Sequence, residues 1–229
     1  PPLRRRPPEP TPRGRPGSGP RPLVPAGIEA CLFDLDGVLT DTAAVHAAAW
    51  KEMFDAFLLE RSRRSGEPFR PFELPGDYVA HVDGKLRHDG VRGFLASRGI
   101  TLPEGSTDDP AHLDTVHGLG TRKNELVLEI IRSRGVTVFG GSVRYVEAVR
   151  AADIPRAIVS ASRNCREVLR AAGIEELFEV RVDGITAAAR GLAGKPAPDM
   201  FVEAAGELGV PVERAAVFED AEAGVAAGR

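Results

Sequence analysis

Residues 28–42 of the chain, IEACLFDLDGVLTDT, decide the fold. The mostly apolar run from Ile28 to Phe33 has the length and composition of a buried strand. Asp34 and Asp36 follow at once, and Gly37 permits a tight turn beside them. In an open parallel sheet, functional residues gather where the strands end at their carboxyl edge. This stretch therefore predicts a first strand that delivers two carboxylates to a functional edge.

The final third of the chain alternates between strand and helix patterns. Short apolar runs separated by amphipathic segments predict strands at 156–160, 178–182 and 215–219, and helices at 143–154, 163–174 and 198–209. Such alternation favours an α/β fold, a Rossmann-like parallel sheet core with helices on its faces. The intervening residues 43–137 have mainly helical patterns, so we expect an inserted helical cap after the first strand. The core would then consist of residues 27–42 and 138–229.

The two ends of the chain lead to separate expectations. Residues 1–26 hold ten of the 19 prolines and six arginines, with few large apolar side chains. Such a segment buries too little surface to offset its ordering entropy, which predicts a disordered tail. The chain stops at Arg229 inside an expected helix, so we expect the core to be incomplete at its C-terminal end.

The overall composition excludes several classes of protein. A formal net charge of -3 argues against a dedicated nucleic-acid binder. No stretch reaches the ~18 consecutive apolar residues of a membrane span, so we expect no membrane partner. The two cysteines, Cys31 and Cys165, lie in apolar or helical patterns and are expected to be reduced thiols of a cytoplasmic protein. A monomer is the default expectation.

Four segments place polar residues at predicted strand ends or in a nearby loop. They carry Asp34 and Asp36, Ser160, Lys195, and Glu219 with Asp220. Crowded carboxylates repel one another, and a hard cation such as Mg²⁺ relieves that repulsion. In phosphoryl transfer, Asp34 could act as the nucleophile and Asp36 as the acid and base.

Each feature also has a purely structural interpretation. An Asp-x-Asp pair is often a helix cap or a turn, and a lone serine or lysine is often only a strand-end hydroxyl or a surface charge. Glu219 and Asp220 could simply cap the next helix. The order of the segments and their shared position at strand ends favour the catalytic interpretation.

These segments resemble a known family. DLDGVLTDT, IVSAS, GKPAPD and FEDAEAGV, in this order, are similar to the four motifs of the haloacid dehalogenase superfamily, over roughly residues 28–229. The resemblance implies Asp34 as nucleophile and Asp36 as acid and base, with Ser160 and Lys195 holding phosphate. It also implies a magnesium site made by Asp34, the backbone carbonyl of Asp36, Glu219 and Asp220.

A narrower resemblance concerns the cap. DTAAVHAAAWK (41–51), GKLR (84–87), RKN (122–124) and SASRN (160–164) look like segments of the β-phosphoglucomutase family, although Arg163 replaces a lysine. The implied substrate-binding residues are Thr42, His46, Trp50, Arg87, Lys123, Ser162, Arg163 and Asn164. Singly, each cap residue could be a core side chain or a solvated charge. The stretch 61–80 and the insert near Asp108 depart from the family pattern.

The resemblance implies an isomerase of carbohydrate metabolism. It would interconvert β-glucose 1-phosphate and glucose 6-phosphate through an aspartyl-phosphate and a bisphosphate. An alternative with the same core residues is a phosphatase that hydrolyses a small sugar phosphate. A non-catalytic binding module would normally have lost the nucleophile or a metal ligand. In either enzymatic case the partner is a small phosphorylated sugar.

Overall fold

A four-stranded parallel sheet organises the core. The structure, a computed structural model, describes residues 24–229, and the predicted disordered tail lies almost wholly outside the described residues. The strands are β1 (Ala30–Phe33), β2 (Arg156–Val159), β3 (Val180–Val182) and β4 (Ala215–Phe218), in the order β3-β2-β1-β4. Cys31 of β1 pairs with Arg156 on one side and with Ala216 on the other. All strands point the same way, which confirms the predicted fold class.

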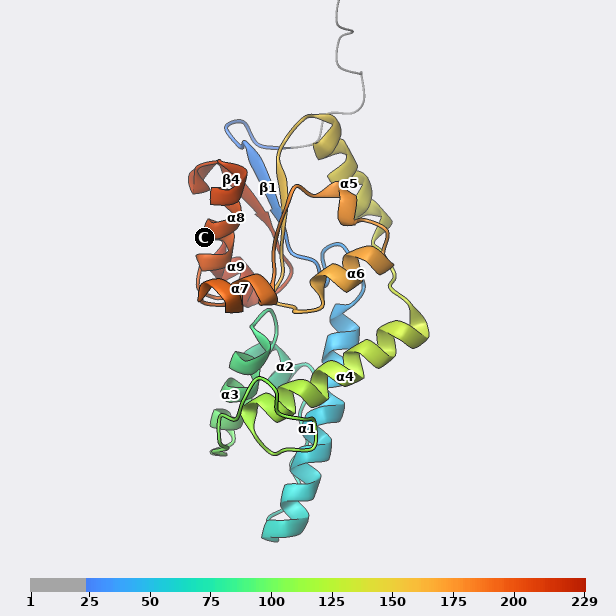
Figure 1. Ribbon diagram of the computed structural model, residues 1–229, viewed down its shortest axis with the longest axis vertical. Helices are drawn as coiled ribbons and strands as arrows, with labels where there is room; N and C mark the ends of the chain where they lie inside the picture. Colours follow the sequence, from blue (N-terminus) through green and yellow to red (C-terminus); the bar gives the residue numbers. More distant parts are fainter. Residues whose placement is uncertain (1–23) are drawn as a thin grey trace, which may run out of the picture.

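Helices cover both faces of this sheet (Figure 1). They are α5 (Gly140–Ala151), α6 (Cys165–Ala171), α7 (Gly184–Arg190), α8 (Asp199–Leu208) and α9 (Glu222–Ala227), with single 3₁₀ turns at Glu175–Leu177 and Val212–Arg214. Because side chains alternate along a strand, Phe33 packs with α5 and α6 in one apolar cluster, whereas Leu32 packs with α8 in another.

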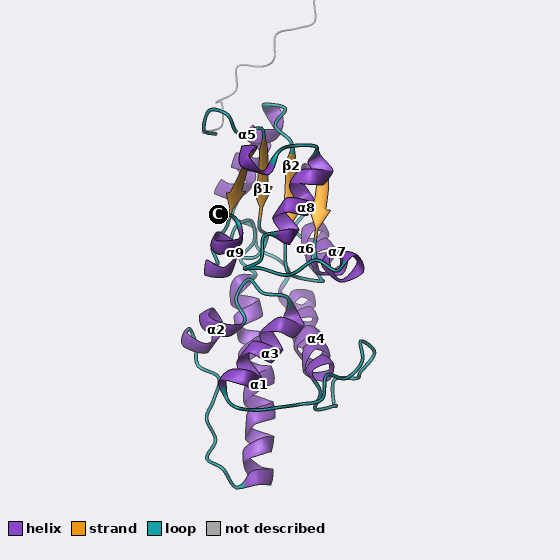
Figure 2. Cartoon of the chain, turned by 90° about the vertical axis from the view of Figure 1, so that its left-hand side faces the viewer, coloured by secondary structure: helices purple, strands orange, loops and turns teal. Residues whose placement is uncertain are grey.

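The inserted cap lies beyond the carboxyl edge of the sheet (Figures 1 and 2). It contains α1 (Ala43–Ser65), α2 (Gly76–His81), α3 (Arg87–Ser97) and α4 (Val116–Arg134). These helices enclose an apolar cluster of their own, in which Phe54 stacks on Trp50 and packs against Phe72 and Phe94. Since α1 begins ten residues after β1 ends, the chain leaves the core directly from the edge that carries Asp34.

Three local features differ from the sequence prediction. Helical spacing and strong helix formers predict a first helix over residues 43–60, but α1 continues to Ser65. Arg64 pairs with Glu60 one turn earlier, and Gly66 ends the helix in a left-handed conformation. Helix α2 lies within residues 61–83, a mixed and Pro-rich stretch for which the sequence predicts no particular element. Helix α7 was not predicted, although its N-cap Asp183 accepts hydrogen bonds from two of its backbone N–H groups.

Cys31 and Cys165 are both buried free thiols. Within residues 24–229, none of the helices has the length and apolar character needed to cross a membrane.

Candidate active site

A buried ion cluster lies at the carboxyl edge of the sheet. Lys195, from the loop before α8, donates from Nζ to Asp34 Oδ1 at 2.7 Å and to the backbone carbonyl of Val159 at 3.1 Å. It also donates to Glu219, which follows β4. Lys195 is 2% exposed and Asp34 is 7% exposed. A buried ammonium needs such partners, because an unpaired charge in the interior costs several kcal/mol.

Two glycines let the acidic side chains approach the backbone. A Cβ atom on Gly37, whose φ is +94°, would lie 2.0 Å from an oxygen of Asp220. A Cβ atom on Gly224 would lie 1.8 Å from an oxygen of Glu219. Any larger residue at either position would push a carboxylate away, so these glycines keep the acidic cluster compact.

Asp34, Glu219 and Asp220 fit a divalent cation. Each offers a carboxylate oxygen, and these oxygens lie within 4.8 Å of one another. Burial, only partly countered by Lys195, raises the pKa of Asp34 to about 8, and burial together with the Glu219 charge raises that of Asp220 to about 6. Crowded carboxylates with raised pKa values gain most from a bound cation, and all of the donors are hard oxygens.

Asp36 faces away from this cluster and toward the cap. The hydroxyl of Thr42 donates to Asp36 Oδ1, and Thr40 and Thr42 share a hydrogen bond of 2.7 Å. Burial alone would raise the pKa of Asp36, but His46 and Thr42 outweigh burial and lower it to about 2. The structure therefore keeps Asp36 ionised and oriented toward His46 of the cap.

Helices α1 and α4 bring three side chains together beside Asp36. Lys123 Nζ lies 2.6 Å from His46 Nδ1 and 4.9 Å from the centre of the Trp50 ring. Burial and the charge of Lys123 lower the pKa of His46, and because the lysine amine donates, His46 Nδ1 is the acceptor of this hydrogen bond. The ring proton then lies on Nε2, which is 3.5 Å from Asp36 Oδ1.

The loop after β2 supplies the next group of predicted residues. Ser160 is fully buried, and its hydroxyl accepts from the backbone N–H of Ser162 at 3.1 Å. Arg163 is exposed, whereas Asn164 is buried at the start of α6. Of this loop, Ser162 and Arg163 line the space beneath the cap, whereas Ser160 and Asn164 do not.

Arg87, at the start of α3, faces this loop from the cap. It donates from Nη2 to Asn124 Oδ1 at 2.8 Å. Burial, followed by repulsion from Arg163, lowers the pKa of Arg87 to about 10, so it remains charged at neutral pH. Among residues 24–229, neither Arg87 nor Arg163 has a carboxylate within ion-pair distance, whereas Arg92 on the same helix pairs with Asp89 and Glu104.

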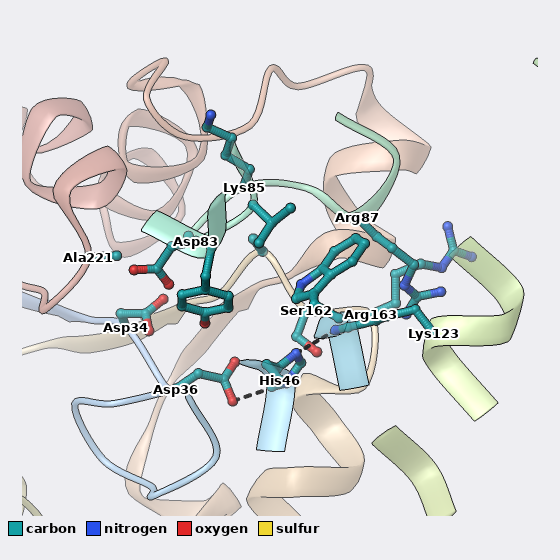
Figure 3. Close-up of a pocket in the computed structure, with 15 residues that line it drawn as sticks. Asp34, Asp36, His46, Asp83, Lys85, Arg87, Lys123, Ser162, Arg163 and Ala221 are labelled. Atoms are coloured by element: carbon teal, nitrogen blue, oxygen red, sulfur yellow. Dashed lines mark hydrogen bonds and ion pairs between the residues drawn. The ribbon is translucent and has the colours of Figure 1, made fainter. Parts of the chain in front are cut away.

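These groups line one pocket between the cap and the core (Figure 3). Asp34, Asp36 and Asp83 lie toward one end, and Arg87, Lys123 and Arg163 lie toward the other, with His46 between them. The predicted residues that line the pocket are Asp34, Asp36, His46, Trp50, Arg87, Lys123, Ser162 and Arg163. The other predicted residues do not line the pocket: Thr42, Ser160, Asn164, Lys195, Glu219 and Asp220. Thr42 and Lys195 nevertheless donate hydrogen bonds to the lining residues Asp36 and Asp34.

The pocket also contains residues that sequence reasoning missed. Tyr78, Asp83 and Lys85 line it from the cap, and burial together with the charge of Asp83 raises the pKa of Tyr78. Asn124 does not line the pocket but contacts Arg87. Asp83 directly precedes the quoted GKLR segment, and Asn124 ends the quoted RKN segment. Both residues therefore lie in or beside a quoted motif, but the sequence alone does not indicate a role for either of them.

The cap and the core are in close contact around this pocket. A Cβ atom on Gly84 of the cap would lie 3.1 Å from Ala221 Cβ of the core. A Cβ atom on Gly194 of the core would lie 2.5 Å from the side chain of Leu86. Small residues on both sides therefore allow the cap loop to rest against the loops that carry Lys195 and Glu219.

The chain matches a protein-family model over residues 28–229, and it belongs to the haloacid dehalogenase-like hydrolase family. A relative from Mycobacterium tuberculosis, described as β-phosphoglucomutase, is 56% identical over 206 residues, which cover 90% of this chain and 79% of the relative. Membership and this similarity imply a divalent metal at the acidic cluster.

Solved structures agree with this assignment. The crystal structure of β-phosphoglucomutase from Clostridium difficile matches with a TM-score of 0.66 and 25% identity, covering 88% of this chain and 80% of that one. CbbY from Rhodobacter sphaeroides, solved with xylulose-(1,5)bisphosphate, matches with a TM-score of 0.64 and 26% identity, covering 88% and 81% of the two chains.

Proposed function

We propose that this protein is a magnesium-dependent β-phosphoglucomutase, which interconverts β-glucose 1-phosphate and glucose 6-phosphate. The observation that carries the proposal is the distribution of charge in the pocket. Asp34 and Asp36 lie at one end, and Arg87 and Arg163, cations without ion-pair partners among the described residues, lie toward the other. A sugar with a phosphate at each end matches this arrangement, and the relative from M. tuberculosis supports it.

In the proposed cycle, Asp34 begins as an aspartyl-phosphate. The C6 hydroxyl oxygen of β-glucose 1-phosphate attacks the phosphorus, Asp36 takes the hydroxyl proton, and the bond from phosphorus to Asp34 breaks. The resulting glucose 1,6-bisphosphate then turns over in the pocket. Asp34 attacks the phosphorus at C1, Asp36 returns its proton to the leaving O1, and glucose 6-phosphate departs.

Asp34, Glu219, Asp220 and the backbone carbonyl of Asp36 would hold the Mg²⁺. The ion would neutralise charge on the transferring phosphoryl group and on the carboxylates around it. Lys195 and Ser160 would stabilise the same phosphoryl oxygens. The hydrogen bond from Thr42 and the nearby His46 would keep Asp36 ionised and ready to accept a proton.

The cap would recognise the remainder of the substrate. Arg87, with Arg163, Ser162 and Asn164, would hold the phosphate that is not reacting, because guanidinium groups bind phosphate through charge-assisted hydrogen bonds. Trp50 and Lys123 would contact the sugar. We also propose that residues 43–137 move as a cap, and that its closure keeps water from the aspartyl-phosphate. A monomer is sufficient for this site.

Phosphorus NMR tests the proposal directly. The protein is incubated with β-glucose 1-phosphate, Mg²⁺ and a trace of glucose 1,6-bisphosphate. Conversion of the C1 phosphate signal to the C6 phosphate signal, with little inorganic phosphate, is the expected result. Stoichiometric release of inorganic phosphate without isomerisation would instead establish a phosphatase.

A further inference from the structure

One side-chain oxygen joins the cap to the core. Asn124 Oδ1, on α4, accepts from Arg87 Nη2 at 2.8 Å and from Asn164 Nδ2 at 2.8 Å. Arg87 belongs to the cap, whereas Asn164 belongs to the core, where it precedes α6. We call this three-residue arrangement, Arg87, Asn124 and Asn164, the amide bridge.

The chemistry of Arg87 fixes the orientation of both amides. A guanidinium can only donate hydrogen bonds, so the Asn124 atom that faces it must be the oxygen. The Asn164 atom that faces the same oxygen must then be its NH₂ group. The amide bridge is therefore a single acceptor shared by two donors, rather than an arbitrary contact between polar side chains.

The two donors of the bridge are residues that the proposed function assigns to the non-reacting phosphate. We propose that Asn124 is a positioning residue, whose amide oxygen occupies Arg87 and Asn164 before substrate binds and yields them to a phosphate oxygen afterwards. This inference rests on the proposed function for the identity of the ligand. The bridge itself, as a link between cap and core, does not depend on it.

The neutrality of Asn124 is what makes the exchange possible. A hydrogen bond from a guanidinium to a phosphate is charge-assisted at both partners, whereas one to an amide is charge-assisted only at the donor. A phosphate therefore displaces the amide readily. An aspartate at this position would form an ion pair with the largely buried Arg87, and the incoming phosphate would have to break that pair.

The first test uses the ligand-free full-length chain. Asn124→Leu removes the acceptor and should loosen the cap, so its radius of gyration in small-angle X-ray scattering should exceed that of the wild type. Asn124→Asp keeps an oxygen acceptor for Asn164 of the core and should stay compact. Ser133→Asp is the charge control, because it adds the same charge at an exposed position near the far end of α4. If Asn124→Leu does not fold, Asn124→Ala makes the same comparison.

The second test measures binding of glucose 6-phosphate through the fluorescence of Trp50, the single tryptophan. Asn124→Asp should weaken binding about tenfold or more, with KM for β-glucose 1-phosphate rising more than kcat falls. Asn124→Leu should bind more tightly than Asn124→Asp, and Ser133→Asp should bind like the wild type.

Asn124→Leu should thus be the most affected variant in scattering, and Asn124→Asp the most affected in binding. A merely structural role for Asn124 would give the same order in both tests. Wild-type affinity in Asn124→Asp, or an unchanged radius of gyration in Asn124→Leu, overturns the inference. If the wild-type protein fails to bind glucose 6-phosphate, the proposed function fails, and the scattering comparison still decides whether Asn124 joins cap and core.

Discussion

The core edge and the cap differ in whether their buried cations have carboxylate partners. At the core edge, the buried Lys195 contacts the side chains of Asp34 and Glu219 before any ligand binds. Across the pocket, Arg87 donates only to a neutral amide, and no carboxylate among residues 24–229 pairs with it. The difference indicates that the groups for the chemical step are preorganised in the core. The cap instead presents an arginine without a carboxylate partner, which can bind an anionic substrate.

The largest expected effect comes from the core. Asp34→Asn replaces the proposed nucleophile with an amide of nearly the same shape, so kcat should fall by about 10⁴-fold or more. Product formation followed by phosphorus NMR measures the loss, and circular dichroism checks the fold. Asp41→Asn, at an exposed position soon after it in the chain, should retain wild-type turnover. Substantial turnover by Asp34→Asn would remove Asp34 as nucleophile.

The second prediction concerns the contribution of Lys195 to the stability of the core edge. Lys195→Met keeps the length of the side chain but leaves Asp34 and Glu219 buried without their cation, so the free energy of unfolding should fall by about 3–5 kcal/mol. Urea denaturation without added metal measures the change. The matched control is Lys51→Met, because Lys51 is 41% exposed and its partner Asp55 is 28% exposed, so this change should cost about 1 kcal/mol or less. Equal losses would show that the buried cluster is not special.

The two regions also differ in how far the sequence predicts them. The position of Asp34 follows from a short apolar strand with a carboxylate after it, and Glu219 follows β4 in the same manner. Parallel strands bring such residues to one edge whatever the details of the loops between them. The fold class and the meeting of Asp34, Lys195 and Glu219 could therefore be expected from local pattern and order.

The cap is less predictable, because its contacts depend on how helices pack. His46 and Trp50 share a helix face by spacing alone, but nothing local indicates that Lys123, 77 residues beyond His46, lies between their side chains. Helix α2 lies in a Pro-rich stretch without helical periodicity, and its neighbour Asp83 enters the pocket only because α2 packs beside α3. Nothing in the sequence distinguishes Asn124; its role becomes visible only from its hydrogen bonds with Arg87 and Asn164.

Arg87 provides the corresponding test of the cap. Arg87→Ala removes a guanidinium that would bind the non-reacting phosphate, so mutase turnover at low substrate should fall by about 10- to 100-fold. Hydrolysis of a simple aryl phosphate, which lacks a second phosphate, should change far less. Arg92→Ala, on the same helix but already paired with Asp89 and Glu104, should leave both reactions near wild type. Equal losses of both activities would favour a phosphatase.

The smallest expected effect is the pH dependence of stability that Asp34 contributes at the core edge. Burial raises the pKa of Asp34 to about 8 in the metal-free protein, far above the value of about 4 for an unfolded chain. Between these values the folded state binds the extra proton, so its stability falls as pH rises, by about 1 kcal/mol per pH unit. The lowered pKa values of Lys123 and His88 in the cap act in the opposite direction.

Comparison with Asp34→Asn isolates this contribution, since the cap groups are the same in both proteins. In chelator, the free energy of unfolding of the wild type minus that of Asp34→Asn should decrease steadily from pH 6.5 to pH 8. Saturating Mg²⁺ favours the ionised carboxylate, so it should stabilise the wild type more at pH 8 than at pH 6.5. A difference that is constant across this range would mean that Asp34 is already ionised without metal, and that Lys195 alone is enough to keep it so.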